Sequence, residues 1–418
     1  MRRRIFLFLL LAACCFLGSC EKEKEEQTEI TLIHGWGTME EDHVRMRRIY
    51  QDFEKLYPQV KLNLVSMPSP EEVINKMEDM LSVGKVPDLV FTSGYGKNDV
   101  YQFMREREKA VDLLPYIERD QEFAESIAPE NISYWSQDGH LYTVSDVLLL
   151  AGGYWYNEEI FRQAGIERQP VTWEEFIAAC DRIREWSESG SQSVVPIQIT
   201  QESSIYLAEA LLADGDGGWG RTVEPHHMDL TAEDYRPVLE TMERLYQYGL
   251  DTGENYGYRD VVGMFNSGRV AMYINGVWAS ALIGSDISVK YAVFPGKDGK
   301  TLSCVSAGVG YIAGNTGDAR RIEASIKFLK YMLSEEVQKR ILLETGQMPA
   351  NPNIRLEDYR ESLPIMYQAA EAIRSADRII EVPSNLWSSR QIESFQNHIM
   401  DVMLGKIDEE RFVKQLNR

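Results

Sequence analysis

The chain has 418 residues, of which 44% are hydrophobic and 26% charged, and its formal net charge is −21. Its length and ordinary composition favour a globular protein of two or three domains. Its acidity disfavours binding to nucleic acid or anionic lipid, which carry the same sign of charge. Acidity also keeps proteins soluble, so it does not by itself name a ligand.

The first twenty residues have the pattern of a secretory signal. Three arginines precede an apolar segment, Ile5 to Phe16, that is too short to favour a membrane span. The segment ends in Leu-Gly-Ser-Cys20, which resembles the lipobox of bacterial lipoproteins. That resemblance implies removal of residues 1–19 and a lipid anchor on Cys20, which would hold the protein on the extracytoplasmic face of the cell membrane. The charged residues 20–29 then predict a flexible tether.

The next segments predict two helices between three strands. The expected strands are Ile30–Ile33, 60–64 and Pro87–Phe91, and the expected helices end at Pro58 and Gly84. This βαβαβ order is typical of a parallel sheet covered by helices, with ligands beyond the carboxyl ends of the strands. Two such ends are the loops His34–Gly37 and Thr92–Gly96, each with glycine and an aromatic residue.

The rest of the chain continues to alternate strands and helices. A turn at Asp138–Tyr142 leads into a strand, and Tyr154–Tyr156 is strand-like. A capping box, Thr172 to Glu175, predicts the beginning of a helix. Apolar periodicity predicts one long helix or two in series over Ile322–Ile341, and a terminal helix over Ile392–Met403. No Pro/Ser linker divides the chain, so two domains joined by one linker are not indicated.

Motifs for catalysis or for a bound metal or cofactor are missing from the sequence. It has no GxSxG or HExxH, and 294–301 fails as a phosphate loop because its first position is Phe294. Asp214–Gly218 fails as a calcium loop because the twelfth position is Pro225. No catalytic residue, cofactor or metal is therefore expected. Cys180 and Cys304 could form a disulfide, although the apolar face of a predicted helix around Cys180 favours a buried thiol.

Aromatic side chains recur where turns are predicted. In FNSGRVAMYINGVW, residues 265–278, an apolar strand stops at Asn275-Gly276 and Trp278 follows. The others are Trp36, Tyr95, Trp219 and Trp387. A flat ring can stack on the apolar face of a pyranose while nearby amides and carboxylates pair with its hydroxyls. Any single tryptophan is more often core, but their shared place in Gly/Asn loops favours a cleft.

The ordered set of short motifs resembles the extracellular solute-binding proteins of the maltose-binding type, the lipoprotein receptors of bacterial sugar importers. The motifs run from about Ile30 to the C-terminus and include Pro87-Asp88-Leu89, Asp138–Tyr142, Tyr156-Asn157, Pro170–Phe176, Asn275–Trp278, Ala307–Gly310 and Gly346–Pro349. One departure is Ser145, where the family often has proline.

The resemblance implies an α/β fold of two lobes, each a mostly parallel sheet flanked by helices, joined by a hinge of crossing strands. It implies an N-lobe of residues 30–145 plus 293–331 and a C-lobe of 146–292 plus 332–418. It also places a set of residues around the ligand: Trp36, Ser93, Tyr95, Asp146, Gln201, Glu202, Trp219, Trp278, Gly308 and Trp387.

The function that the resemblance implies is capture of a carbohydrate, in particular an oligosaccharide, by a monomeric non-enzyme. The protein would deliver the sugar to the permease subunits of an ABC transporter. Two alternatives stay open: a secreted carbohydrate-active enzyme, and a receptor of the same fold that senses a sugar or binds another solute.

Overall fold

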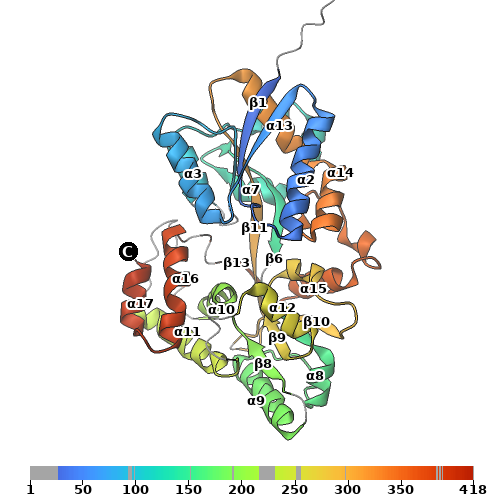
Figure 1. The fold of residues 1–418 in the computed structure, drawn as a ribbon, viewed down its shortest axis with the longest axis vertical. Coiled ribbons are helices and arrows are strands. Elements are labelled where there is room, and N and C mark those ends of the chain that lie inside the picture. The colour runs from blue at the N-terminus through green and yellow to red at the C-terminus, as the bar shows by residue number, and fades with distance from the viewer. Residues whose placement is uncertain are drawn as a thin grey trace, which may run out of the picture.

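The computed structural model describes residues 27–417 apart from 93–96, 98, 151, 191–192, 216–230, 251–255, 297, 383–384, 386 and 388. These residues form two lobes stacked along the longest axis of the molecule (Figure 1). The N-terminal segments, in blue, build the N-lobe, and the middle of the chain and the last helices build the C-lobe. The predicted signal, Cys20 and most of the tether lie outside the described residues.

The N-lobe begins with the predicted βαβαβ unit. Its elements are β1 (Thr28–His34), α2 (Glu41–Leu56), β2 (Val60–Ser66), α3 (Pro70–Ser82) and β3 (Leu89–Phe91). β1 lies between β2 and β3 and is parallel to both. The strand begins earlier than predicted, because Thr28 and Glu29, placed in the tether, pair with Val60 and Lys61 of β2.

Four short helices, one hairpin and two later helices complete the described part of the N-lobe. They are α4 (Asp99–Glu106), α5 (Leu114–Glu118), α6 (Gln121–Glu125), α7 (Pro129–Trp135), the hairpin β4 (Ser136–Gln137) and β5 (His140–Leu141), α13 (Ala319–Leu333) and α14 (Glu335–Arg340). The helix predicted over 322–341 is thus two in series, and the Ser334 side chain caps the second of them. Val337 and Ile341 pack in the N-lobe core, although the predicted boundary at residue 331 gave them to the C-lobe.

Strands that cross between the lobes form the hinge. They are β6 (Ser145–Leu150) and β11 (Leu302–Ala313). Two short strands pair with them: β12 (Met348–Pro349) with β6, and β13 (Arg378–Glu381) with β11. β11 spans both lobes, since Leu302 packs in a C-lobe core and Ile312 in the N-lobe core. In Figure 1, β6 and β11 run from the upper lobe toward the lower one.

The C-lobe surrounds a four-stranded sheet of order β10-β7-β9-β8. Its elements are β7 (Gly153–Asn157), α8 (Glu158–Gln163), α9 (Trp173–Ser189), β8 (Val195–Gln198), α10 (Gln201–Asp214), α11 (Ala232–Tyr246), α12 (Tyr258–Asn266), β9 (Val270–Ile274), the 3-10 helix η2 (Val277–Ala281) and β10 (Val289–Val293). Later segments add the π-helix η3 (Ile341–Thr345) at the junction of the lobes, the 3-10 helix η4 (Leu356–Tyr359), α15 (Pro364–Arg374), α16 (Ser389–Met403) and α17 (Glu409–Leu416).

The two-lobed α/β architecture is confirmed, but the sheets are mixed rather than mostly parallel. In the C-lobe sheet, β7 is antiparallel to both β9 and β10, and β8 and β9 are parallel. In the N-lobe sheet, β11 is antiparallel to β3 and β6. β6 and β11 are antiparallel to each other because they carry the chain between the lobes in opposite senses.

Both cysteines of the folded part are buried free thiols. Burial raises the pKa of Cys180 and of Cys304, so neither thiol ionises readily. Among the described residues, none of the helices combines the length and apolar character that crossing a membrane requires.

Candidate functional site

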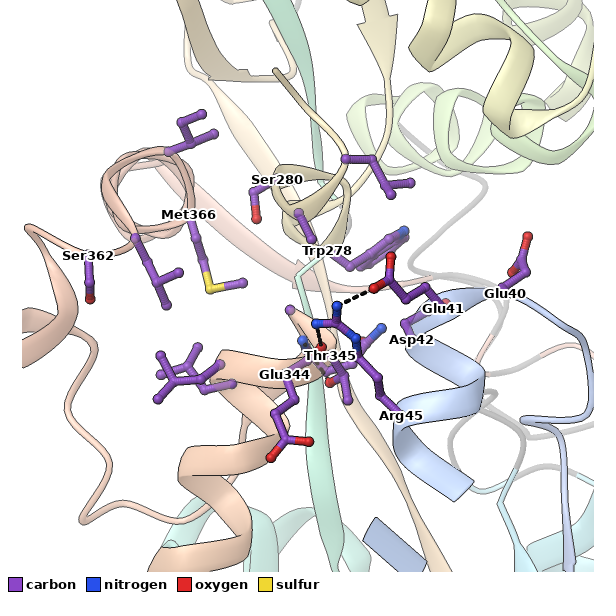
Figure 2. A pocket seen from close by; sticks show the side chains of 18 of the residues that line it. Glu40, Glu41, Asp42, Arg45, Trp278, Ser280, Glu344, Thr345, Ser362 and Met366 are labelled. Carbon is purple, nitrogen blue, oxygen red and sulfur yellow. Dashed lines mark hydrogen bonds and ion pairs between the residues drawn. The ribbon is translucent and has the colours of Figure 1, made fainter. Parts of the chain in front are cut away.

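A cavity of about 440 Å³ lies between the lobes. The N-lobe contributes the beginning of α2, and the C-lobe contributes α12, η2 and α15, with η3 at the junction (Figure 2). Trp278 lies within it: its indole extends toward Glu41 and Arg45, and Met366 and Ser362 lie on the other side (Figure 2). A cavity of this size, mostly apolar with a few polar groups, is typical of small-ligand sites.

The turn after β9 explains how Trp278 is presented. β9 is buried at every residue and ends at Asn275, which is also buried. The Tyr291 hydroxyl donates to the Asn275 carbonyl at 3.1 Å, and Trp155 Nε1 donates to the Gly276 carbonyl at 3.1 Å. Two hydrogen-bonding side chains of the C-lobe core thus hold the backbone of the turn from which Trp278 projects.

Gly276 is required because the indole folds back over it. A Cβ built at Gly276 would lie 2.2 Å from a carbon of the Trp278 ring. Tyr206 of α10 meets the indole edge-to-face, with 5.9 Å between ring centroids. Trp278 therefore packs on backbone and on one other aromatic ring, and it belongs to none of the hydrophobic cores that the described residues form.

Replacing Gly276 with alanine is expected to weaken ligand binding several-fold and to change the melting temperature little, because the added Cβ displaces the Trp278 ring without opening the core. Titration calorimetry measures this. Gly263→Ala on α12 is the matched control, since a Cβ there meets nothing within 4 Å. Equal affinities of both variants and wild type would contradict this role for Gly276.

Charged side chains of the two lobes meet at the edge of the cavity. Arg259 of α12 donates to the carboxylate of Glu40, next to α2, with 3.1 Å between Nε and Oε1. Glu202, at the start of α10, faces the same carboxylate: partial burial and the charge of Glu40 raise its pKa. Within the described part of the chain, Glu202 has no hydrogen bond or ion pair; it is not among the residues that line the cavity, and its ligand contact stays a prediction.

The Arg259–Glu40 ion pair joins the lobes, so we expect it to favour their closed arrangement. Exposed ion pairs contribute up to about 1 kcal/mol and are screened by salt. Arg259→Gln is therefore expected to raise the Kd two- to fivefold and to flatten its dependence on NaCl in calorimetric titrations. Arg374→Gln breaks exposed pairs within the C-lobe alone and serves as control. An unchanged salt response in Arg259→Gln would rule out this contribution.

Trp36 and Asp146 belong to a buried polar cluster of the N-lobe. Trp36 lies edge-on against His43 and Phe91, with 5.0 and 5.8 Å between ring centroids. Asp146 is 2% exposed, and its carboxyl oxygens have no hydrogen-bond partner among the described residues. Burial raises the pKa of Asp146 to about 8. Burial, and after it the charge of Asp146, also raises the pKa of Tyr50 and of Tyr311, whose hydroxyls bond each other. Asp146 is not among the residues that line the cavity, and its ligand contact stays a prediction.

The other predicted site residues have structural partners. Trp387 is fully buried in a C-lobe core, 5.5 Å from Phe395 between ring centroids. The Gln201 side chain donates to the Gln396 carbonyl of α16 at 2.6 Å. Gly308 has a φ of +93°, and a Cβ there would lie 1.7 Å from the Val147 carbonyl oxygen, so glycine is required where β11 crosses β6. Their ligand contacts stay predictions, while Ser93, Tyr95 and Trp219 lie outside the described residues.

Several residues that line the cavity or contact Trp278 are absent from the sequence-based set. Tyr206, which meets the Trp278 ring, follows Glu202 by one helical turn and could have been found from that spacing. The acidic run Glu40–Asp42 follows the Gly-Trp-Gly loop after two residues, so a signal for it also exists. No local signal marks η3 or α15, since their place in the cavity depends on the packing of the lobes.

One group of described residues has donor atoms close enough for a metal ion, namely Glu40, Asp42 and His43. Two of its three members already have partners: Glu40 bonds Arg259, and His43 Nδ1 lies 2.8 Å from Thr38 Oγ1. Burial lowers the pKa of His43, so the ring is neutral at pH 7. We therefore interpret the group as part of the contact between the lobes.

Comparisons with known proteins agree with this architecture. A "Multiple sugar-binding protein" of Streptococcus mutans is 22% identical over 352 residues, which cover 81% of this chain and 80% of that protein. A solute-binding protein of Streptococcus pneumoniae, solved with the blood group A-trisaccharide, superposes with a TM-score of 0.75 at 23% identity, over 93% of this chain and 98% of that one. A chitin oligosaccharide binding protein gives 0.76 at 20% identity, over 94% and 98%.

The family itself is established by the sequence. Residues 37–339 match the model of the family described as bacterial extracellular solute-binding protein. This range includes both crossing strands, the beginning of α2 and the Asn275–Trp278 turn, whereas the lining residues of η3 and α15 lie beyond it. The chain belongs to the family of bacterial extracellular solute-binding proteins.

Proposed function

We propose that this protein captures an oligosaccharide between its lobes and delivers it to the permease of an ABC transporter. The observation that carries the proposal is the position of Trp278: a partly exposed indole on a rigid turn, inside a cavity of about 440 Å³ that residues of both lobes line. An aromatic ring held in this way offers a flat apolar surface to a pyranose. Glu202, Glu40 and Glu41 supply hydrogen-bond acceptors for its hydroxyls.

The names of similar proteins support the choice of ligand and transporter. Sugar or oligosaccharide binding is named in the Streptococcus mutans relative and in the chitin oligosaccharide binding protein. A relative from Pyrococcus horikoshii, which matches 96% of this chain at 22% identity, is named as an ABC transporter extracellular-binding protein.

The action of the site follows from its division between the lobes. A ligand that touches Trp278 on the C-lobe and α2 on the N-lobe makes all its contacts only when the lobes are closed. It shifts the equilibrium toward closure by its difference in affinity for the two states. The permease would then recognise the closed, loaded form, and no bond of the sugar is broken.

We further propose that Cys20 carries the anchor of this monomeric receptor. Support comes from the Leu-Gly-Ser-Cys20 motif after a short apolar segment and from the charged residues that follow it. Two or more acyl chains hold a protein stably on a membrane, whereas a single chain holds it only reversibly. Mass spectrometry of the membrane-extracted protein tests this: an unmodified chain that begins elsewhere than at Cys20 contradicts it.

A panel of oligosaccharides tests the function. The mature chain is mixed with each sugar, its melting temperature is measured, and the mixture is then separated by chromatography. We expect at least one sugar to raise the melting temperature and to be recovered intact. Recovery of cleavage products would instead indicate a carbohydrate-active enzyme, and stabilisation by non-sugar solutes alone would contradict carbohydrate binding.

A further inference from the structure

The cavity beside Trp278 continues into a space bounded by η2, η3 and α15, which we call the apolar compartment. Its apolar lining residues are Leu282, Leu342, Leu343, Leu363, Ile365 and Met366, and polar residues of the same segments, among them Ser280, Thr345 and Ser362, lie between them. In Figure 2 these elements surround the space on the side of Trp278 opposite to Glu40 and Asp42.

Two leucines of the compartment are unusually exposed. Leu343 of η3 is 51% exposed, and Leu282, directly after η2, is 40% exposed. Single exposed leucines are common on protein surfaces. These two, however, come from separate elements and line one cavity, together with the buried Leu342 and Met366. Water in this space contacts apolar walls, so an apolar group that replaces it gains affinity.

The charges at the entrance restrict the occupant. Glu40, Glu41 and Asp42 line the cavity, and both of its arginines already bind protein groups: Arg45 pairs with Glu41 and Arg259 with Glu40. Among the described lining residues no cation is left for an anionic ligand. A carboxylate- or phosphate-bearing sugar would face this acidic rim without a counter-charge, so the occupant is neutral or cationic.

We propose that the apolar compartment binds a sugar substituent that ends in a methyl group, on the same oligosaccharide whose ring stacks on Trp278. The substituent is the acetamido group of an N-acetylhexosamine or the C6 methyl of a 6-deoxyhexose. The compartment is continuous with the Trp278 side of the cavity and lies between the lobes, which favours a part of the same sugar over a peptide. The acidic rim disfavours an acidic sugar, and the apolar side chains favour a methyl group. The inference rests on the proposed function, because it needs a sugar at Trp278.

Matched sugar pairs test the inference on the mature chain by titration calorimetry. N-acetyllactosamine and lactose differ only in the acetamido group, and L-fucose and L-galactose differ only at C6. Transfer of one methyl group from water predicts about fourfold tighter binding of the methyl-bearing member in at least one pair. The pair that shows the preference identifies the substituent.

Two variants and one control assign the preference to the compartment. Leu343→Asn and Leu282→Asn change exposed side chains, so both should fold, and each is expected to bring the affinity ratio within the preferred pair close to one. Val83→Asn changes a residue that is 69% exposed after α3, outside the cavity, and should leave the ratio unchanged. An unchanged ratio in both leucine variants would overturn the assignment.

The results separate the two proposals. Binding of unsubstituted sugars without preference for either methyl-bearing probe overturns the inference and leaves the proposed function intact. Absence of binding to every sugar, in these pairs and in the panel above, overturns both.

Discussion

Trp278→Ala is expected to lower the affinity for a bound oligosaccharide at least tenfold, which corresponds to about 1.4 kcal/mol. The indole offers an apolar surface to the ligand, and alanine removes nearly all of it. The melting temperature should change little, because Trp278 packs on Gly276 and on the edge of Tyr206 rather than in a core. Calorimetric titration and thermal unfolding of the same preparation measure both quantities.

Trp387→Ala is the contrast for this experiment. Trp387 is fully buried against Phe395, and removal of a buried tryptophan costs about 3–5 kcal/mol of stability. Its variant should therefore melt at a much lower temperature. If Trp278→Ala instead lost stability and kept its affinity, Trp278 would be a core residue and the proposed ligand platform would be wrong.

Asp146→Asn should have the second large effect, on the pH dependence of stability. Burial raises the pKa of Asp146 to about 8, from an ordinary value of 3.8. Between these values the folded state holds a proton that the unfolded state has lost, so the free energy of unfolding falls as pH rises. Each pH unit corresponds to about 1.4 kcal/mol for one proton. From pH 6.5 to 8.5 we expect the free energy of unfolding of the wild type to fall by on the order of 2 kcal/mol. In Asp146→Asn this fall should be absent, because asparagine does not titrate.

Urea denaturation at both pH values measures this difference. His34 acts in the opposite sense: burial lowers its pKa from 6.5 to about 3, so the folded ring is neutral while the unfolded ring still loses protons just above pH 6.5. This contribution is the same in wild type and Asp146→Asn, so the difference between their slopes reports Asp146. Asp138→Asn is the control, since this side chain is 74% exposed and should keep the wild-type slope. Equal slopes for wild type and Asp146→Asn would show that the Asp146 carboxyl is ionised in the folded protein.

The sequence by itself determined the local elements and the turn that carries Trp278. Met46, Ile49, Tyr50 and Phe53 recur at helical spacing and are buried in α2 as predicted. The Thr172 side chain begins α9 as the capping pattern predicted, accepting from the Glu175 amide at 3.2 Å. Such signals are readable because hydrogen bonds and apolar contacts within one helix involve residues a few positions apart.

Only the tertiary structure decided which of the aromatic and acidic residues face the cavity. Trp278 and Trp387 follow similar turn residues, yet one lines the cavity and the other lies in a core. Arg259 and Glu40 meet although 219 positions separate them, and Leu343 joins the compartment through η3. The physical reason is that burial and charge pairing depend on how the crossing strands set one lobe against the other. The arrangement of the lobes depends on many weak contacts between segments that are distant in sequence. No short stretch of the sequence therefore indicates it.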